Sequence, residues 1–366
     1  MYGYVIMSNH LHMVVQSGNG ELSDLLRDFK KFTAAKIIEK IKSNQVDWWG
    51  IFYLASFIGS LQFVLEHGQQ DDWFNDNLIL SLSVVSLFGL LLFIKRELTY
   101  KHPIVNLKVL KNTNLRVGTI MSFIMGFGLY GSTFIVPIYT QSVLGWSATD
   151  AGLLLIPSSI TTGIMMPFIG KMIQRGIPQA YMVAIGFLIF FFFTFWMNNI
   201  ITPDTSAEEM FWPLILRGVG LGLLFVPITT LSLSTLKGKH IGEGAAFTGM
   251  MRQLGGSFGI AIITTFIAIF NQQHRVNLIS HLDQTSFQVQ QTVQRLQQGF
   301  MSKGFTFNEA LSKAYKAIEF KVMVQSSVLT YMDIFMYLGI LFLLCIPFIL
   351  IIKKGKNKID LAEAMH

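Results

Sequence analysis

Charged side chains and cysteine are both scarce in this sequence. Only 13% of the 366 residues are charged, against roughly 25% in an average soluble domain. Hydrophobic residues make up 52% of the chain, and the mean hydropathy is +0.50. A soluble fold of this length needs charge to coat its surface, whereas a surface in contact with lipid needs none. The composition therefore disfavours an ordinary soluble enzyme and favours an integral membrane protein.

Other absences restrict the class of protein further. A single cysteine, Cys345, excludes an internal disulfide, and it lies inside an apolar run. Residues 1–20 lack a basic region followed by an apolar block, so no cleavable signal peptide is predicted. The formal net charge is +7. Because the basic residues cluster between apolar runs, membrane topology explains them better than nucleic-acid binding does.

Eight apolar stretches are long enough to span a bilayer, which takes about 20 mostly apolar residues. They lie near 47–66, 78–94, 115–139, 149–170, 179–198, 211–235, 246–270 and 330–352. The predicted fold class is an all-α polytopic membrane protein with about eight transmembrane helices, preceded by a short α/β fragment. For such a chain, the predicted partner of the apolar helix surfaces is the lipid bilayer.

The charges between these stretches predict an orientation. The segment that joins the second and third stretches is rich in lysine and arginine, whereas the loops 67–77 and 199–210 contain acids but no lysine or arginine. Because basic residues mark the cytoplasmic side, both chain ends are predicted to be cytoplasmic. The long segment 271–329 is predicted to be external, with two amphipathic helices. The second begins at a capping-box pattern of Thr306 and Glu309.

Several sequence blocks carry a family resemblance. They include VDWWGIFYLASFIGSLQFVLEHGQQDDWF (46–74), LGWSATDAGLLLIP (144–157), FVPITTLSLSTL (225–236) and MMRQLGGSFGIAI (250–262). In this order they resemble the C-terminal portion of fourteen-span drug:proton antiporters of the major facilitator superfamily, the EmrB/QacA type. The resemblance covers residues 46–366.

The resemblance implies both an organisation and a function. Residues 46–95 would be two joining transmembrane helices, and residues 96–366 a six-helix C-terminal domain with the external loop 271–329. The implied function is not enzymatic and needs no cofactor. It is proton-coupled efflux of small amphipathic or cationic drug-like compounds across the bacterial inner membrane. The family's N-terminal six-helix domain has no counterpart in these residues. We therefore expect a truncated transporter that is inactive alone and that an N-terminal transporter half could complete.

Three polar residues inside the apolar stretches are candidates for a substrate or proton pathway. Arg252 lies deep enough to approach the bilayer centre, where an unpaired guanidinium is costly. Arg217 is nearer a predicted helix end and could extend outward to the interface. Asp333 is placed near the start of the last span, where a helix N-terminus favours an acid. For each residue, a purely structural role is the alternative.

Small and capping residues are expected to serve packing. Gly255 with Gly259, and Gly218 with Gly222, place small side chains one helical turn apart, which lets helices approach closely. Ser147 with Asp150 forms a typical helix cap. The phenylalanine-rich run 187–196 is expected to pack or to face lipid.

Residues 1–45 are different in character. The segment YGYVIMSNHLHMVVQSGNGELSDLLRDFKKFTAAKI resembles part of a single-tyrosine HUH transposase of the REP-associated type. By that resemblance, His10 and His12 are vestigial metal ligands, and this fragment supplies no catalytic tyrosine. Two alternatives remain for the whole chain: a membrane-tethered remnant of a DNA transposase with metal-dependent nicking, and an inert or partner-dependent membrane subunit.

Overall fold

A computed structural model describes residues 3–6, 11–14, 47–69, 71–100, 107–236, 238–282 and 286–347. The chain divides into two compact units. One comprises residues 1–116, 232–250 and 353–366, and the other comprises residues 117–231 and 251–352. Each unit is described below by itself.

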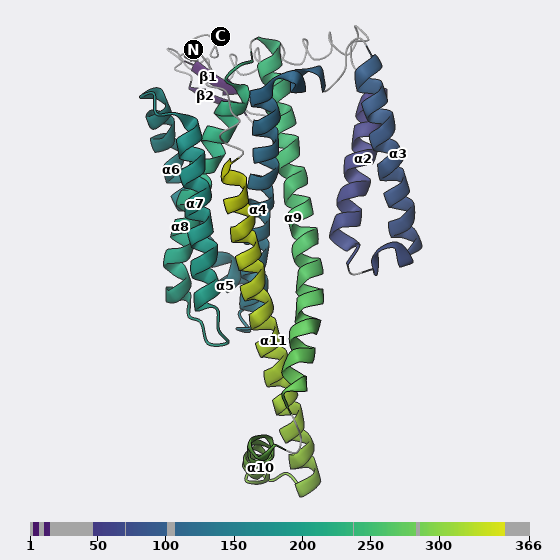
Figure 1. The fold of residues 1–366 in the computed structure, drawn as a ribbon, viewed down its shortest axis with the longest axis vertical. Helices are drawn as coiled ribbons and strands as arrows, with labels where there is room; N and C mark the ends of the chain where they lie inside the picture. The colour runs from purple at the N-terminus through teal and green to yellow at the C-terminus, as the bar shows by residue number, and fades with distance from the viewer. Residues whose placement is uncertain are drawn as a thin grey trace, which may run out of the picture. The chain divides into compact units, whose positions relative to one another are not determined.

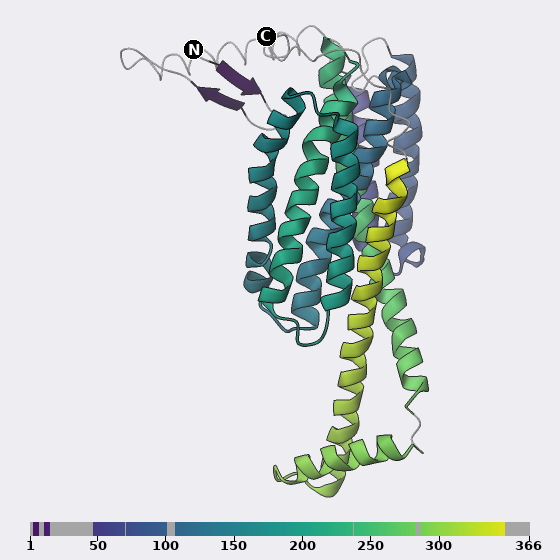
Figure 2. The ribbon, with the colours of Figure 1, turned by 60° about the vertical axis from the view of Figure 1, so that its left-hand side comes forward.

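The first described residues form a β-hairpin (Figure 2). Strand β1 (Gly3–Ile6) pairs antiparallel with β2 (Leu11–Val14), with Val5 opposite His12. The two strands agree with the short α/β fragment predicted at the start of the chain. His10 lies outside the described residues.

Two antiparallel helices form the next part of the same unit (Figure 1). They are α2 (Trp48–His67) and α3 (Asn77–Thr99), joined through the short helix η1 (Trp73–Asn75). Close approach requires Gly89, because a Cβ there would lie 3.0 Å from the backbone nitrogen of Phe57. The Ser86 hydroxyl donates to the Phe57 carbonyl at 3.3 Å. These contacts make the pair a packed hairpin with mostly apolar, exposed outer faces.

The remaining helices are divided between the two units, and most of their residues belong to the second. They are α4 (Thr113–Ser142), α5 (Ala148–Leu153), α6 (Ile156–Gln174), α7 (Gln179–Ile200), α8 (Ala207–Leu233), α9 (Lys239–Ser280), α10 (Phe287–Met301) and α11 (Phe307–Cys345); a short helix, η2 (Leu107–Lys111), precedes α4. With α5 and α6 counted together, the described chain has 8 helices long and apolar enough to cross a membrane. The predicted all-α membrane fold and the number of spans are confirmed.

The predicted packing residues lie at helix contacts. A Cβ on Gly255 would collide with the Phe123 carbonyl of α4, and one on Gly259 would lie 2.8 Å from the Phe127 carbonyl. On α8, a Cβ on Gly222 would lie 2.8 Å from the Cβ of Met165 on α6. The glycine prediction is therefore confirmed: α9 approaches α4, and α8 approaches α6, through glycine. Ser147 caps α5 as predicted, accepting from the Asp150 amide at 3.1 Å.

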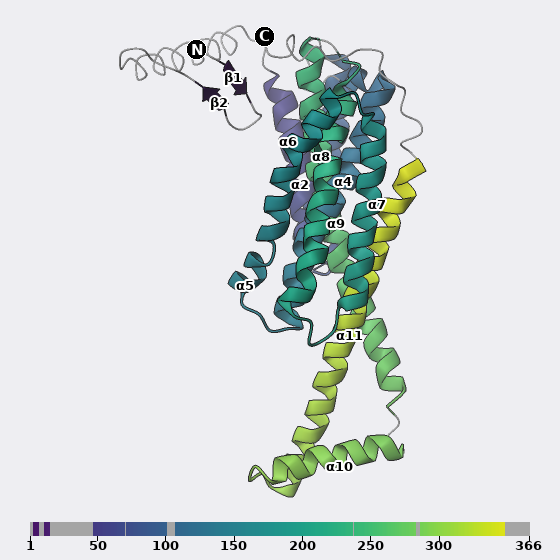
Figure 3. The same ribbon diagram turned by 90° about the vertical axis from the view of Figure 1, so that its left-hand side faces the viewer.

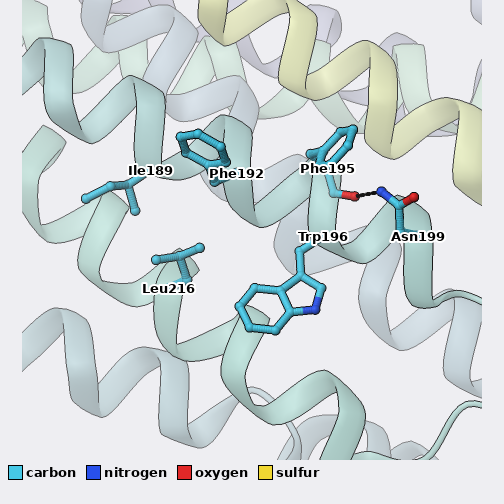
Figure 4. A pocket seen from close by; sticks show the side chains of 6 residues that line it. All are labelled: Ile189, Phe192, Phe195, Trp196, Asn199 and Leu216. Carbon is cyan, nitrogen blue, oxygen red and sulfur yellow. Dashed lines mark hydrogen bonds between the residues drawn. The ribbon is translucent and has the colours of Figure 1, made fainter.

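The phenylalanine-rich segment of α7 has two faces. Phe190 is buried and stacks on Phe342 of α11, with ring centroids 4.1 Å apart. Phe192 and Phe195 are exposed and line a groove of about 470 Å³ between α7 and α8 (Figure 4). Trp196 also lines this groove. The segment packs on one side and presents aromatic rings on the other, as expected.

The helices that contain the last two predicted spans extend well beyond those spans. The stretch 246–270 is part of α9, which runs to Ser280, and the stretch 330–352 overlaps α11, which begins at Phe307. Both helices continue as amphipathic helices beyond their apolar stretches, and hydropathy alone does not detect such a continuation. The segment 271–329 is therefore largely helical. It contains both predicted amphipathic helices, α10 and the first part of α11, and the capping box of Thr306 and Glu309 is confirmed.

Within the six-helix domain, the connections fall at two ends. The turn between α4 and α5 and the connection between α7 and α8 lie at the same end (Figures 1 and 3). The extensions of α9 and α11, with α10, project from that end too. The polar candidate residues lie along the helices between the two ends.

Candidate functional site

Arg217 is enclosed inside the six-helix domain. Its side chain on α8 is 3% exposed. Nε donates to the Ser132 hydroxyl at 2.8 Å, and Nη1 donates to the Ser158 hydroxyl at 2.9 Å. Nη2 donates to the Thr133 hydroxyl at 2.5 Å and to the Leu129 carbonyl at 3.3 Å. The guanidinium thus ties α8 to both α4 and α6.

Neutral oxygens alone satisfy this charge among the described residues. A guanidinium near the bilayer centre costs about 2.5–3.5 kcal/mol on insertion scales. One hydrogen bond to a charged group contributes about 1.5–3 kcal/mol. Four such bonds outweigh the cost, so Arg217 needs no carboxylate to be stable where it is.

The expectation that Arg217 extends outward to the interface is wrong. The adjacent Gly218 explains why: a Cβ at that position would collide with the Ser158 carbonyl, so its absence lets α6 close over the arginine. Sequence reasoning missed the partners because serine and threonine are common in membrane helices and carry no charge to draw attention. Ser132 and Ser158 are both fully buried.

Arg252 has a different environment in the same domain. The helix α9 begins at Lys239, so Arg252 lies about 20 Å along the axis at about 1.5 Å per residue. Its side chain is half-buried, and the guanidinium carbon lies 4.4 Å from the centroid of the Phe225 ring of α8. Among the described residues, no hydrogen-bond acceptor or carboxylate pairs with it. A cation–π contact contributes about 0.5–2 kcal/mol, which is less than the roughly 2.5–3.5 kcal/mol that a charge costs at the centre of a bilayer.

The surroundings of Arg252 are polar but carry no acid in the described part of the chain. The hydroxyl of Tyr130 on α4 donates to the side-chain carbonyl of Gln253 at 2.9 Å. The backbone here is held tightly, because a Cβ on Gly126 would collide with the Arg252 carbonyl. Arg252 and Gln253 are therefore presented by a rigid helix pair, and their polar ends stay accessible.

Asp333 is paired, and its predicted environment was wrong. It lies deep within α11, which begins at Phe307, so it is not near a helix N-terminus. Instead, Oδ2 lies 2.8 Å from Nε2 of His274 on α9. One turn away, the Asn271 amide donates to the Ser327 hydroxyl at 2.8 Å. Sequence reasoning missed His274 because it was assigned to a loop, whereas it lies on the continuation of α9.

These polar residues form three separate sites. The side chain of Arg217 is buried, and that of Arg252 is half-buried without a counter-ion among the described residues. The His274–Asp333 pair is partly exposed between α9 and α11. The structure does not bring Arg217, Arg252 and Asp333 together through any hydrogen bond or ion pair among described residues. Groups of three or more metal-ligating side chains do not occur in the described residues. His12 lies in β2, and His10 is outside the described part.

The chain is similar to known export proteins. It is 30% identical to the fatty acid resistance protein FarB of Neisseria gonorrhoeae, over 84% of this chain and 59% of that protein. It is 24% identical to the colistin resistance protein EmrB of Acinetobacter baumannii, over 86% of this chain and 60% of that protein. It is 28% identical to the multidrug export protein EmrB of Escherichia coli K12, over 65% of this chain and 46% of that protein. The chain therefore spans about half to three-fifths of the length of these relatives.

Structural comparison finds a bacterial homologue of the human lysosomal transporter Spinster, in an inward-facing, unoccupied conformation, with a TM-score of 0.45 and 15% identity. The match covers 83% of this chain and 70% of that protein. The sequence profile of the Major Facilitator Superfamily matches residues 43–260, which include α2 to α8 and much of α9. From that match and from the eight apolar helices, we conclude that this chain belongs to the Major Facilitator Superfamily.

Proposed function

We propose that this chain serves as the C-terminal domain, with two joining helices, of a proton-coupled exporter of amphipathic drug-like compounds in the bacterial inner membrane. The observation that carries the proposal is the half-open Arg252 within a superfamily six-helix domain. A charge on a membrane-spanning helix, without a counter-ion among the described residues, is typical of a wet transport pathway. Multidrug and fatty acid resistance proteins among its relatives support the substrate class.

Transport by this domain requires a second body. Superfamily transporters bind substrate near the midplane between two six-helix halves, and they alternate access by rocking one half against the other. The described residues supply one six-helix domain together with the α2–α3 hairpin. We therefore expect residues 1–366 to be inactive alone and to export only with an N-terminal half.

Ethidium efflux from a bacterial host that lacks its own pumps tests the proposal. Three strains are compared. The first expresses the chain alone, the second expresses it together with a separately encoded N-terminal half of a relative, and the third expresses that half alone. Efflux that requires both polypeptides and disappears with a protonophore supports the proposal. Efflux from the chain alone would contradict it and would indicate a working assembly of identical copies. Absence of efflux with co-inserted halves would also contradict it.

The proposed orientation has both chain ends in the cytoplasm. It rests on the basic-residue asymmetry of the segments between spans. Single cysteines introduced into a Cys345→Ser background test this orientation on intact cells. The four positions are Asn75, Ser206, Ser302 and Asn357. An impermeant thiol reagent should label the first three and spare the fourth. Labelling of Asn357→Cys alone would reverse the orientation.

For residues 1–45 we propose a transposase remnant without activity. The paired strands β1 and β2 are compatible with that origin, but a two-stranded hairpin is marginal as a core. Metal-dependent nicking also needs a nucleophile, and the fragment supplies no tyrosine after its histidines. We expect no cleavage of hairpin DNA by the purified chain, with magnesium or manganese. A covalent phosphotyrosine adduct would contradict this.

A further inference from the structure

Helices α7 and α8 form an exposed apolar groove (Figure 4). It has a volume of about 470 Å³ and lies within two of the membrane-spanning helices. On α7 it extends from Ile189 to Asn199, a length of roughly 15 Å at about 1.5 Å per residue. Phe192, Phe195 and Trp196 line the groove and are 44–56% exposed. In hydrocarbon such a groove favours an alkyl chain, which gains dispersion contacts along the rings.

The Asn199 end of the groove is polar. The side-chain amide nitrogen of Asn199 donates to the Phe195 carbonyl at 2.6 Å, which leaves the side-chain oxygen as an acceptor (Figure 4). The indole N–H of Trp196 donates to no group among the described residues, and an indole can only donate. An occupant of the groove therefore meets one acceptor and one donor near this end. The ester carbonyl of an acyl chain provides the acceptor that the indole lacks.

The connection between α7 and α8, which follows this end, is acidic. Residues 199–210 contain Asp204, Glu208 and Glu209, all exposed, and no lysine or arginine. Glu209 lies seven residues before Leu216, which lines the groove on α8, so the two share one face of that helix. Negative charge is therefore placed about two helical turns from the α8 wall of the groove, on the side of its polar end.

This charge distinguishes between phospholipid head groups. An anionic head group would meet like charges, whereas a primary ammonium would meet opposite charges and can also donate to the Asn199 oxygen. Basic residues outside the apolar stretches do not cancel the acids. Arg275 of the α9 extension pairs with an acid of α11 at 2.8 Å. On α11, Lys321 lies about 16 Å along the helix from Met332, whose carbonyl accepts from Asn198 beside the groove, and charges that far apart are largely screened.

We propose that this groove binds a phospholipid whose head group carries a primary ammonium, as in phosphatidylethanolamine. One acyl chain lies along Phe192 and Phe195, and the Trp196 indole donates to its ester carbonyl. The ammonium lies between the Asn199 oxygen and the acids of the α7–α8 connection. The proposal goes beyond the proposed function, because binding at this exposed groove needs neither a transported compound nor a second transporter half.

Photolabelling of the full chain in lipid nanodiscs tests the proposal. The probe is phosphatidylethanolamine with a diazirine in one acyl chain, and labelled peptides are mapped by mass spectrometry. Phosphatidylethanolamine, phosphatidylcholine and phosphatidylglycerol with identical acyl chains compete. Phosphatidylethanolamine should displace the label on the groove peptides of α7 and α8 about 2- to 5-fold more effectively than phosphatidylglycerol, which is the scale of exposed ion pairs. Phosphatidylcholine should be intermediate, because it is cationic at the same position but has no N–H donor.

Three outcomes of this experiment would overturn the proposal. Equal competition by phosphatidylglycerol would show that the acids do not select the head group. Equal competition by phosphatidylcholine would exclude a donated hydrogen bond from the ammonium. Label that avoids the groove peptides would show that something other than this lipid covers the groove.

Charge variants locate the head-group contact. Asp204→Asn combined with Glu208→Gln should remove most of the preference for phosphatidylethanolamine over phosphatidylglycerol. Glu209 is kept, because its carboxylate accepts from the Ser206 amide at 2.8 Å and caps α8. The matched control changes two exposed acids of the α2–α3 connection, Asp71→Asn with Asp72→Asn, and should keep the full preference. An unchanged preference in the first variant, or its loss in the control, would contradict the site.

Groove variants locate the acyl-chain contact. Trp196→Phe keeps a ring and removes the N–H donor, so groove labelling should fall about 2- to 5-fold. The matched control is Trp49→Phe on α2, an exposed tryptophan outside the groove, which should label as the unmodified chain does. Leu216→Trp should fill the groove and abolish its labelling. Melting in detergent confirms that each variant is folded. Unchanged labelling of the folded Leu216→Trp variant would reduce the contact to ordinary bilayer lipid and overturn the proposal.

Discussion

Two arginines of this chain show that a charged residue within apolar helices can serve either the fold or a function. Arg217 and Arg252 both lie on apolar helices, yet the first is sealed by four neutral acceptors and the second lies over a ring with its edge open. A charge whose donors are all satisfied holds helices together. A charge whose donors are left free is retained for something that the domain itself does not contain.

The largest expected effect on stability comes from replacing the buried Arg217. Arg217→Leu removes all four hydrogen bonds that tie α8 to α4 and α6, and it leaves the buried Ser158 hydroxyl without its donor. An unsatisfied buried group costs about 1–3 kcal/mol, and each lost bond to the charge about 1.5–3 kcal/mol, so we expect severe loss of folded protein. Thermal melting in detergent, followed by size-exclusion fluorescence, measures it. A melting temperature like that of Arg252→Leu would remove the distinction between the two arginines.

Removing the open arginine should spare the fold and impair transport. In a complete transporter carrying this domain, Arg252→Leu should lower efflux about 10-fold or more, because one charge-assisted hydrogen bond is worth about 1.5–3 kcal/mol. Arg252→Lys should lower it less. Ethidium and a carboxylate substrate should both be assayed. Full efflux of both by the leucine variant would make Arg252 structural.

A glycine on the facing helix tests whether Arg252 depends on its backbone position. A Cβ on Gly126 would collide with the Arg252 carbonyl, whereas Gly249 on α9 has nothing within 4 Å. Gly126→Ala should therefore separate α4 from α9 and lower the melting temperature. Gly249→Ala should be neutral or stabilising by up to about 1 kcal/mol through helix propensity. Equal melting temperatures of the two variants in detergent would refute the close contact.

Asp333, in contrast to Arg252, has a side-chain partner, which is His274. The bond links α9 to α11 at 2.8 Å and is partly exposed, so its coupling should be modest. A double-mutant cycle with His274→Gln and Asp333→Asn should give about 0.2–1 kcal/mol. Chemical denaturation in detergent at neutral pH provides the four free energies. A coupling near zero would show that the contact is incidental.

The smallest effect concerns a third arginine, which is paired with a carboxylate. Burial alone would raise the pKa of Asp47, but hydrogen bonds from Arg96 and the Gly50 amide, together with the charge of Arg96, lower it below the ordinary value of 3.8. The pair therefore stabilises α2–α3 above that value, and the contribution disappears as the pH falls through the lower folded pKa. Because Arg96 is about one-third exposed, solvent screens the pair.

Hydrogen exchange of the first turn of α2 measures this effect. Amide protection, corrected for intrinsic exchange, should fall in the unmodified chain as the pH is lowered below the ordinary aspartate pKa of 3.8 and through the lower pKa of Asp47 in the folded chain. Asp47→Asn should show little change across the same range. Identical profiles for the two chains would mean that the ion pair does not hold the start of the helix.

Much of the architecture follows from sequence, since lipid imposes long apolar helices. The eight spans were predictable for that reason. The glycine contact at Gly255 was predictable from small residues one helical turn apart, and the capping box at Thr306 from the spacing of Thr306 and Glu309. The partners of Arg217 were not, because they are neutral residues brought together by tertiary packing. His274 was missed because α9 continues past its apolar stretch, where the signal changes from hydropathy to helical periodicity.

Reaction with an arginine-specific dicarbonyl reagent most directly tests the contrast between Arg217 and Arg252, because it needs no substitution. The full chain in nanodiscs is treated with phenylglyoxal, and modification of each arginine is followed by mass spectrometry. The account predicts that Arg252 reacts while Arg217 stays protected until the domain unfolds. Equal reaction rates at the two arginines, or an unreactive Arg252, would contradict it.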